Sequence, residues 1–349
     1  MESVLITGGA GFVGSHAAEF YDNKGVEVTV VDNLSRESTL ADADEDRDTA
    51  TYNWNYLIKN HPDVELIQAD VRNSDSMESL VDGHDAIIHT AGQVAVTSSL
   101  ENPVTDHEIN ITGTLNILES ARQADSDPSV VFASTNKVYG DNINKIPVRE
   151  MDTRYIFDDE EFTDGISESV SIDQCEHTPY GVSKLAADQY VQDYAERGEV
   201  DTAVFRMSCI YGPRQFGNED QGWVAHFGIS AIEDEELTIF GDGKQVRDVL
   251  YVKDLIRAYD QFLSNPDVKS GVYNIGGGSI NTTSLIELLD LLEETTSNRP
   301  SVVYDEWREG DQRVYISDIS KAKSELNWQP KVSLQQGIKR FVDWYRTTQ

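Results

Sequence analysis

Cysteine is nearly absent from this chain of 349 residues, which holds only Cys175 and Cys209. Two cysteines placed so far apart form neither a disulfide framework nor a ligand set with metal-site spacing. No apolar run approaches the roughly 20 residues that span a bilayer, and the chain opens with an apolar strand pattern rather than a charged leader. From these absences we expect a soluble, cytoplasmic protein without a metal site.

Basic residues are also scarce, because 28 Lys and Arg stand against 62 Asp and Glu, for a formal net charge of -34. Nucleic acid and anionic membranes require a basic face and are therefore not expected as partners. The acidity fits either a solvated surface that resists association or adaptation to high salt, where counterions screen repulsion. We favour the second and predict a halophilic source, since carboxylates crowd residues 41–48, 158–161 and 233–236.

Short apolar runs alternate with helical patterns through the first 205 residues. Apolar runs without polar alternation are typical of parallel strands that helices cover on both faces. The alternation predicts an α/β fold with a doubly wound parallel (Rossmann) sheet, followed by a smaller C-terminal α/β domain. Strands are expected at residues 4–6, 28–31, 64–68, 86–89, 129–133 and 202–205, and helices near 14–24, 75–82, 105–124 and 180–197.

The domain boundary is expected where this rhythm gives way to glycine-rich turns, with the first domain at residues 1–207 and the second at 208–349. Residues 246–263 have the pattern of a strand or turn followed by a helix, and we expect them to return to the first domain. Residues 141–179 exceed an ordinary connection in length, which predicts a functional loop or lid.

A glycine-rich turn follows the first expected strand, with Gly8, Gly11 and Gly14 spaced G-x-x-G-x-x-G at the head of a helix. Glycines there permit a tight turn and let a pyrophosphate approach the N–H groups at the positive helix end. Asp32 ends the second strand, where its carboxylate can accept ribose hydroxyls and repels a 2′-phosphate. We therefore expect NAD rather than NADP, with the nearby Arg36 as the feature that favours NADP.

Further candidate cofactor contacts lie at the ends of the next two strands. Asp70-Val71 are placed to meet the adenine edge, and Ala91-Gly92-Gln93 to line the adenosine side. Ordinary strand-terminal turns are the alternative for both segments. The full set expected to bind the cofactor is Gly8, Gly11, Phe12, Val13, Asp32, Asn33, Asp70, Val71, Ala91, Gly92, Gln93, Tyr180 and Lys184.

Tyr180 and Lys184 are four residues apart within the run Tyr-Gly-Val-Ser-Lys. In a helix their side chains lie on one face, one turn apart. A phenol normally titrates near pH ~10 and is a poor base at neutrality, but a nearby cation favours the phenolate. Tyr180 is therefore a candidate general base, and a pair of ordinary packing residues is the alternative.

Together with the run Ser134-Thr135-Asn136-Lys137-Val138-Tyr139-Gly140, these motifs resemble the extended short-chain dehydrogenase/reductase family, in its sugar-nucleotide epimerase and dehydratase branch. The resemblance covers nearly the whole chain. Its later markers are Phe205-Arg206, Tyr211-Gly212-Pro213, residues 243–248 and 273–277, and Trp328-Gln329-Pro330. Residues 91–95, 134–141, 214–216, 220–224 and 243–250 are similar to the subfamily of CDP-paratose (CDP-tyvelose) 2-epimerases.

The resemblance implies that Thr135, Tyr180 and Lys184 are catalytic. Thr135 would hydrogen-bond the sugar oxygen that loses its proton, and Lys184 would also hold the nicotinamide ribose. The implied reaction oxidises C2 to a 2-keto sugar and returns the hydride to the opposite face. In related dehydratases the two positions after the threonine carry an aspartate and a glutamate that eliminate water. Asn136 and Lys137 stand there in this chain, so dehydration is disfavoured.

A nucleotide-diphosphate sugar brings two negative charges, so a chain of charge -34 must supply local cations. Guanidinium groups match phosphate oxygens in pairs, and salt bridges to the many carboxylates are the alternative. The arginine candidates are Arg206, Arg214, Arg247, Arg308 and Arg313, of which we favour Arg247 and Arg308. Trp223 is expected either beside the substrate or in the core. The substrate-binding set that we expect is Asn136, Lys137, Gln215, Arg247 and Arg308.

Two other functions stay open from the sequence. An enzyme similar to UDP-glucose 4-epimerase would use the same catalytic residues, and chemistry alone does not separate C2 from C4. A non-catalytic NAD-binding regulator, by contrast, should lack the tyrosine–lysine pair. By the same family resemblance we expect a homodimer or homotetramer that pairs through the helices near residues 105–124 and 180–197.

Overall fold

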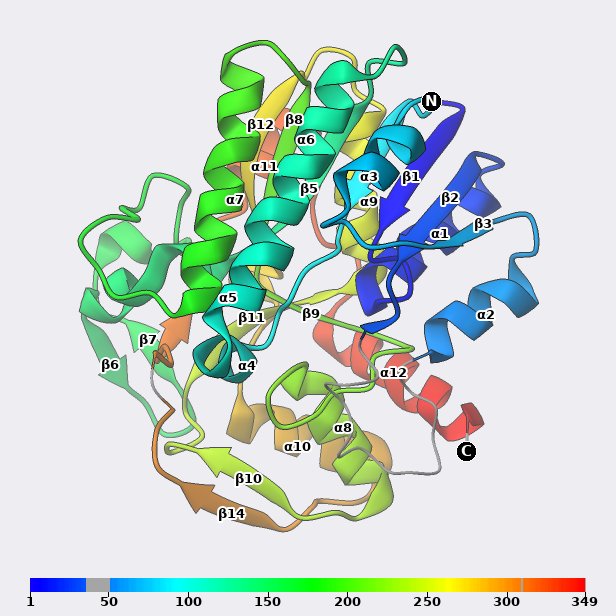
Figure 1. Ribbon diagram of the computed structural model, residues 1–349. Coiled ribbons are helices and arrows are strands. Elements are labelled where there is room, and N and C mark those ends of the chain that lie inside the picture. Colours follow the sequence, from blue (N-terminus) through cyan, green and yellow to red (C-terminus); the bar gives the residue numbers. More distant parts are fainter. Residues whose placement is uncertain (36–50, 309, 349) are drawn as a thin grey trace. The chain divides into compact units, whose positions relative to one another are not determined.

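The computed structural model describes residues 1–35, 51–308 and 310–348 (Figure 1). Arg36 and the acidic segment 41–48 lie outside the described residues. The chain forms two compact units. The first comprises residues 1–135, 182–205 and 256–273, and the second comprises residues 136–181, 206–255 and 274–349.

A seven-stranded sheet is the centre of the first unit, with strand order β12-β8-β5-β4-β1-β2-β3 (Figure 1). Strand β1 lies parallel to both β2 and β4, so the chain order reverses on either side of β1. This arrangement is the predicted doubly wound sheet, and ligands of such folds bind where the strand order reverses. The strands are β1 (Ser3–Thr7), β2 (Glu27–Asp32), β3 (Glu65–Gln68), β4 (Ala86–His89), β5 (Ser129–Thr135), β8 (Thr202–Met207) and β12 (Ser270–Ile275).

Helices α6 and α7 lie side by side over one face of this sheet (Figure 1), where their apolar residues share a core with Leu5, Ile87 and Phe132. Burial of both faces explains why the strands are apolar throughout. The helices that surround the sheet are α1 (Phe12–Asn23), α2 (Tyr52–Asn60), α3 (Ser74–Val81), α6 (Gly113–Gln123), α7 (Pro179–Glu196) and α9 (Val252–Leu263).

The helix expected near residues 105–124 is present, but its winding changes twice along the chain. Helix α4 (Val96–Glu101) leads into α5 (Pro103–His107), a π-helical turn follows at Glu108–Thr112, and α6 begins at Gly113. The buried side chain of Asn110 sits in that turn. Single π-turns of this kind re-aim side chains and are frequent at functional sites.

The second unit contains a four-stranded sheet centred on β11 (Val246–Tyr251), which pairs with β9 (Cys209–Tyr211), β13 (Thr282–Ser284) and β15 (Val314–Tyr315). A separate parallel pair joins β10 (Leu237–Phe240) to β14 (Val302–Asp305). Helices α8 (Trp223–Glu233), α10 (Leu285–Thr296) and α12 (Leu334–Thr348) enclose a core with Phe227, Leu288 and Phe341. A capping box between Ser284 and Glu287 starts α10, and the short α11 (Ser320–Leu326) precedes α12.

These units divide the chain differently from the boundary expected at residue 207. Residues 136–181 belong to the second unit, because the Tyr155 N–H donates to the Lys244 carbonyl and Ile166 forms a β-bridge with Ser317. The strand half of 246–263 also stays there, since β11 pairs with β9, β13 and β15 of that unit, whereas residues 256–263 return to the first unit. Residues 136–162 contain the 3₁₀ segments η3 (Asn136–Lys145) and η4 (Glu160–Phe162) and the strands β6 (Val148–Glu150) and β7 (Tyr155–Phe157).

None of the helices within the described ranges is long and apolar enough to cross a membrane. The described residues also contain no group of three or more His, Cys, Asp or Glu side chains that could hold a metal ion.

Candidate active site

The glycine-rich turn between β1 and α1 leaves no room for side chains. Gly8 has φ +72°, and a Cβ added to it would lie 2.5 Å from the Ala91 nitrogen. A Cβ on Gly14 would lie 2.4 Å from the Gly8 carbonyl oxygen. Helix α1 begins at Phe12, followed by Val13, and no side chain caps its N-terminus. An anion can therefore approach the backbone N–H groups of the turn at the positive end of helix α1. A dinucleotide pyrophosphate requires such a site.

Asp32 stands at the end of β2 with both carboxylate oxygens fixed by the backbone. Its Oδ2 accepts a hydrogen bond from the Ala10 N–H at 3.0 Å, and its Oδ1 accepts one from the Leu34 N–H at 2.8 Å. The carboxylate is thus held beside the glycine turn in the position that suits a ribose diol.

Asn33 and Asp70 meet at the ends of the neighbouring strands β2 and β3, where Asn33 Nδ2 donates to Asp70 Oδ2 at 2.9 Å. Arg72 donates two hydrogen bonds to the same carboxylate, from Nε at 2.9 Å and from a terminal nitrogen at 2.7 Å. The hydrogen bond from Arg72 holds the pKa of Asp70 well below its ordinary value, and the bond from Asn33 acts in the same direction. Asp70 is therefore a permanent anion at this edge, and the adjacent Val71 is buried.

Asn110 connects the loop after β4 to helix α7. Its Oδ1 accepts from the Gln93 N–H at 2.9 Å, and its Nδ2 lies within hydrogen-bond distance of the Gln93 carbonyl, Asp106 Oδ1 and Ser183 Oγ. A Cβ added to Gly92 would lie 3.0 Å from Asn110 Oδ1. The predicted adenosine-side loop 91–93 is thus held by a residue that the sequence analysis did not single out. The feature that distinguishes Asn110 as a candidate site residue is its position in the π-helical turn, and the sequence does not predict that turn.

Lys184 is buried in α7 and anchors that helix to β5. Its Nζ donates to the Ala133 carbonyl oxygen at 2.7 Å and lies 4.2 Å from the centre of the Phe132 ring. Burial lowers the pKa of Lys184 to about 8, although the carboxylates of Asp188 and Asp106 oppose the shift. The ammonium is still mostly protonated at neutral pH.

Tyr180 and Lys184 occupy successive turns of one helix, because α7 begins at Pro179. The exposed fraction of Tyr180 is 8 %, so most of the phenol is shielded from water. Thr135 is the last residue of β5, and Asn136 begins η3 directly after it. Both side chains are nearly buried as well.

In the second unit, Lys137, Arg247 and Asp311 form a charged group. A terminal nitrogen of Arg247 lies 2.6 Å from Asp311 Oδ1, and Lys137 Nζ donates to the Gly310 carbonyl at 3.4 Å. Burial lowers the pKa of Lys137, and the charge of Arg247 lowers it further. Arg247 therefore has the carboxylate partner that we weighed as an alternative for the arginines, and Asp311 was not anticipated.

Arg308 lies over the Phe240 ring, with 3.8 Å between the guanidinium carbon and the ring centre. One of its terminal nitrogens donates to the Glu219 carbonyl at 3.0 Å and lies 3.2 Å from an Asp220 carboxylate oxygen. Phe240 and the turn containing Glu219 and Asp220 thus hold the guanidinium in place.

The remaining candidates have mainly structural surroundings. Arg206 is buried and donates to the Tyr139 hydroxyl at 3.2 Å, and Arg313 lies 5.4 Å from the Tyr155 ring centre. Arg214 is buried as well and has a left-handed backbone conformation. Gln215 donates to the Ile210 carbonyl at 3.1 Å. Trp223 donates from Nε1 to Cys209 Sγ at 3.3 Å and packs against the core of the second unit, which places it at the edge of that core.

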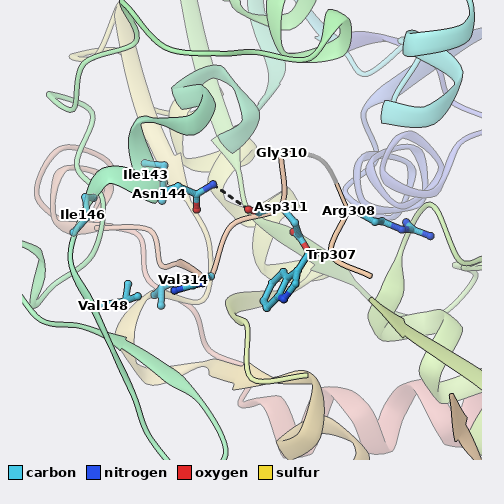
Figure 2. Close-up of a pocket in the computed structure, with 10 residues that line it drawn as sticks. Ile143, Asn144, Ile146, Val148, Trp307, Arg308, Gly310, Asp311 and Val314 are labelled. Carbon is cyan, nitrogen blue, oxygen red and sulfur yellow. Dashed lines mark hydrogen bonds between the residues drawn. The ribbon is translucent and has the colours of Figure 1, made fainter. Parts of the chain in front are cut away.

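A cavity of about 470 Å³ opens beside Asp311 in the second unit (Figure 2). One side is apolar and the other carries charged groups and an indole ring. Asn144 donates from Nδ2 to the Asp311 carbonyl at 3.0 Å, which fixes one wall (Figure 2). The residues that line the cavity are Ile143, Asn144, Ile146, Val148, Trp307, Arg308, Gly310, Asp311, Arg313 and Val314.

The model of the NAD dependent epimerase/dehydratase family matches residues 4–276. A relative that is 42% identical, with 98% of each chain covered, is the CDP-paratose 2-epimerase of Salmonella typhi. Among solved structures, the UDP-glucose 4-epimerase of Thermotoga maritima with UDP-glucose has a TM-score of 0.78 at 30% identity, with 99% of each chain covered. The UDP-glucuronic acid 4-epimerase of Bacillus cereus, in complex with UDP-glucuronic acid and NAD, has a TM-score of 0.80 at 26% identity over 99% of this chain and 100% of its own. The chain belongs to the NAD dependent epimerase/dehydratase family.

Proposed function

We propose that this protein is an NAD-dependent epimerase that inverts C2 of a CDP-linked deoxy sugar, as in the interconversion of CDP-paratose and CDP-tyvelose. The observation that supports this choice is the 42% identity to the Salmonella typhi 2-epimerase over 98% of both chains. The helical pair of Tyr180 and Lys184 gives the proposal its chemistry.

The first unit would hold the dinucleotide. Its glycine turn would receive the pyrophosphate, and the backbone-fixed carboxylate of Asp32 would accept the adenosine ribose hydroxyls. NAD held there would supply reversible hydride acceptance for oxidation and reduction at C2. The other proposed cofactor contacts are Gly8, Gly11, Phe12, Val13, Asn33, Asp70, Val71, Ala91, Gly92 and Gln93.

Tyr180, Thr135 and Lys184 would move and place the proton. The Tyr180 phenolate would accept the proton of the C2 hydroxyl and donate it back after C2 has inverted. Thr135 would donate a hydrogen bond to the same sugar oxygen. Lys184, protonated below its pKa of about 8, would favour the phenolate through its charge.

The second unit would bind the nucleotide sugar through Asn136, Lys137, Gln215, Arg247 and Arg308. The two arginines supply fixed guanidinium groups, one on β11 and one over Phe240. Asn136 and Lys137 also bear on the type of reaction. An amide cannot act as the acid that a dehydratase needs at the first position, so no loss of water is expected.

Incubating the protein with CDP-, UDP- and GDP-sugars and following the products by NMR tests this proposal. We expect inversion at C2 of the CDP-sugar, with no net change in NAD. Inversion at C4 of a UDP-hexose without any C2 product would support the alternative of a UDP-glucose 4-epimerase. That alternative rests on the 30% identity to the Thermotoga maritima enzyme. Stoichiometric NAD binding without turnover of any sugar would indicate the NAD-binding regulator.

We also propose a cytoplasmic homodimer or homotetramer from a halophilic source. Of the two helices expected to pair, α7 exposes apolar side chains, with exposed fractions of 53 % for Val182 and 41 % for Tyr190. Such exposed apolar residues on helices are suited to pairing with a second copy. Sedimentation in molar salt would measure the number of chains, and a monomer at working concentration would contradict this part.

A further inference from the structure

We propose that Lys137 is a substrate-positioning residue that binds the β-phosphate of the nucleotide diphosphate together with Arg247. The inference rests on the proposed function and deepens it. The sequence places Lys137 in the substrate-binding set without saying which part of the substrate it contacts, and the inference assigns it the β-phosphate.

The backbone of Lys137 is packed against the turn that carries Tyr180. A Cβ added to Gly181 would lie 3.1 Å from the Lys137 carbonyl oxygen. From this position the side chain reaches the loop before β15, where Nζ donates to the Gly310 carbonyl at 3.4 Å. A Cβ on Gly310 would in turn lie 3.6 Å from Thr178 Cγ2, two residues before Tyr180. The ammonium is therefore placed at the 310 loop, and both this loop and the Lys137 backbone adjoin the segment 178–181 that contains the proposed base.

Arg247 approaches the same loop from β11. Its exposed fraction is 9 %, and its guanidinium is fixed by the Asp311 carboxylate at 2.6 Å and by the Val246 carbonyl at 2.9 Å. Among the described residues, two cations and one carboxylate thus meet within a chain of net charge -34. A local excess of positive charge in so acidic a protein attracts an anionic group, and phosphate is the anionic part of the proposed substrate.

The charged groups around Lys137 also give the site a signature in pH. Burial lowers the pKa of this ammonium, Arg247 on β11 lowers it further, and Asp311 and the Cys209 thiol on β9 oppose the shift. The Cys209 thiol does not provide a second charge at neutral pH, because burial raises its pKa. A phosphate bound by Lys137 should therefore be released as the pH rises toward the ordinary lysine value of 10.5.

Isothermal titration of CDP and CMP into the NAD-loaded protein between pH 7.5 and 10 tests the inference. The phosphates stay ionised throughout that range. The affinity for CDP should fall by about tenfold or more as the pH rises, while that for CMP, which lacks the β-phosphate, should change little. Lys137→Met should weaken CDP binding by about tenfold at pH 7.5 and remove the dependence on pH. Lys137→Arg should keep the affinity and bind CDP equally well at pH 10, because guanidinium does not titrate there.

Lys145→Met is the matched control, since Lys145 lies in the same η3 segment but is exposed and donates to Asn142 at 2.9 Å. It should bind CDP like the unmodified protein. The inference is overturned if Lys137→Met binds CDP with unchanged affinity, or if Lys137→Arg keeps the full fall with pH, which would assign the titration to another group such as Lys184. Equal losses for CDP and CMP in Lys137→Met would also overturn it. The titration does not depend on turnover, so a protein that shows the signature but epimerises no CDP-sugar would contradict only the proposed function.

Discussion

Lys184 donates a hydrogen bond from Nζ to the carbonyl oxygen of Ala133 at 2.7 Å. This bond connects helix α7 to the C-terminal part of β5. Thr135 follows Ala133 by two residues on that strand, and Tyr180 precedes Lys184 by one helical turn. The lysine is thus a structural anchor for both strand and helix in addition to its proposed roles in cofactor binding and proton transfer.

The lowered pKa of Lys184 should make stability depend on pH. Between a folded pKa of about 8 and the ordinary value of 10.5, the unfolded chain binds more protons than the folded one, so this residue makes stability rise with pH. The whole shift corresponds to about 3 kcal/mol at most. Urea unfolding of the cofactor-free protein at pH 7.5 and 10 should show this gain, and Lys184→Met should lack it. An identical pH slope in both proteins would contradict the buried charge.

Replacing Tyr180 by Phe should lower the turnover rate by about a hundredfold to ten-thousandfold, because the proposed general base is lost. NAD binding should persist, since the glycine turn and Asp32 are untouched. Tyr190→Phe is the control, because Tyr190 lies on the same helix with an exposed fraction of 41 %. Epimerase assays with bound NAD measured in parallel would decide, and unaltered activity of the Tyr180 variant would remove this residue from the mechanism.

Replacing Asp32 by Ala should weaken NAD binding by roughly tenfold to a hundredfold, because two ribose hydroxyls lose a charged acceptor. The variant should also discriminate less against NADP, since the repulsion of a 2′-phosphate disappears. Fluorescence titration with both cofactors measures the two effects. Asp63→Ala, which removes an exposed carboxylate, should bind NAD normally. Unchanged selectivity in the Asp32 variant would place the ribose elsewhere.

The net charge of -34 predicts that the protein needs salt. Counterions screen the repulsion among carboxylates, so the unfolding temperature and the activity should both rise between 0.1 and 3 M KCl. Thermal unfolding followed by circular dichroism at each concentration measures the first effect. Full stability and activity in dilute buffer would contradict the halophilic origin.

Periodicity predicted the central sheet well, because its strands are buried on both faces and their apolar runs are uninterrupted. The expected strands at residues 28–31 and 86–89 fall within β2 and β4. The helix near residues 105–124 shows the limit of this approach, since a π-helical turn keeps nearly the same hydrophobic pattern as an α-helix. The two compact units divide the chain at other places than residue 207 for a related reason. Residues 136–181 are assigned by long-range pairing, such as Ile166 with Ser317, which local patterns do not reveal.

The candidate site was predictable where motifs dictate backbone geometry. The tight turn at Gly8 and Gly14 follows from glycine spacing, and the helical placement of Tyr180 and Lys184 follows from their position in a patterned segment. Partners that come from distant segments were not predictable. Asn110 reaches Gln93 and Ser183 across the fold, and Asp311 reaches Arg247 from a loop 64 residues away in the sequence.

Helix α7 runs through the boundary between the two compact units, with residues up to Gly181 assigned to the second and those from Val182 to the first. The phenol of Tyr180 and the ammonium of Lys184 thus lie on one continuous helix. Their separation along it is fixed at about 6 Å of helical rise, whatever the arrangement of the units. If the second unit binds the sugar, as proposed, substitutions there can change the substrate without changing the spacing of the proposed proton-transfer pair.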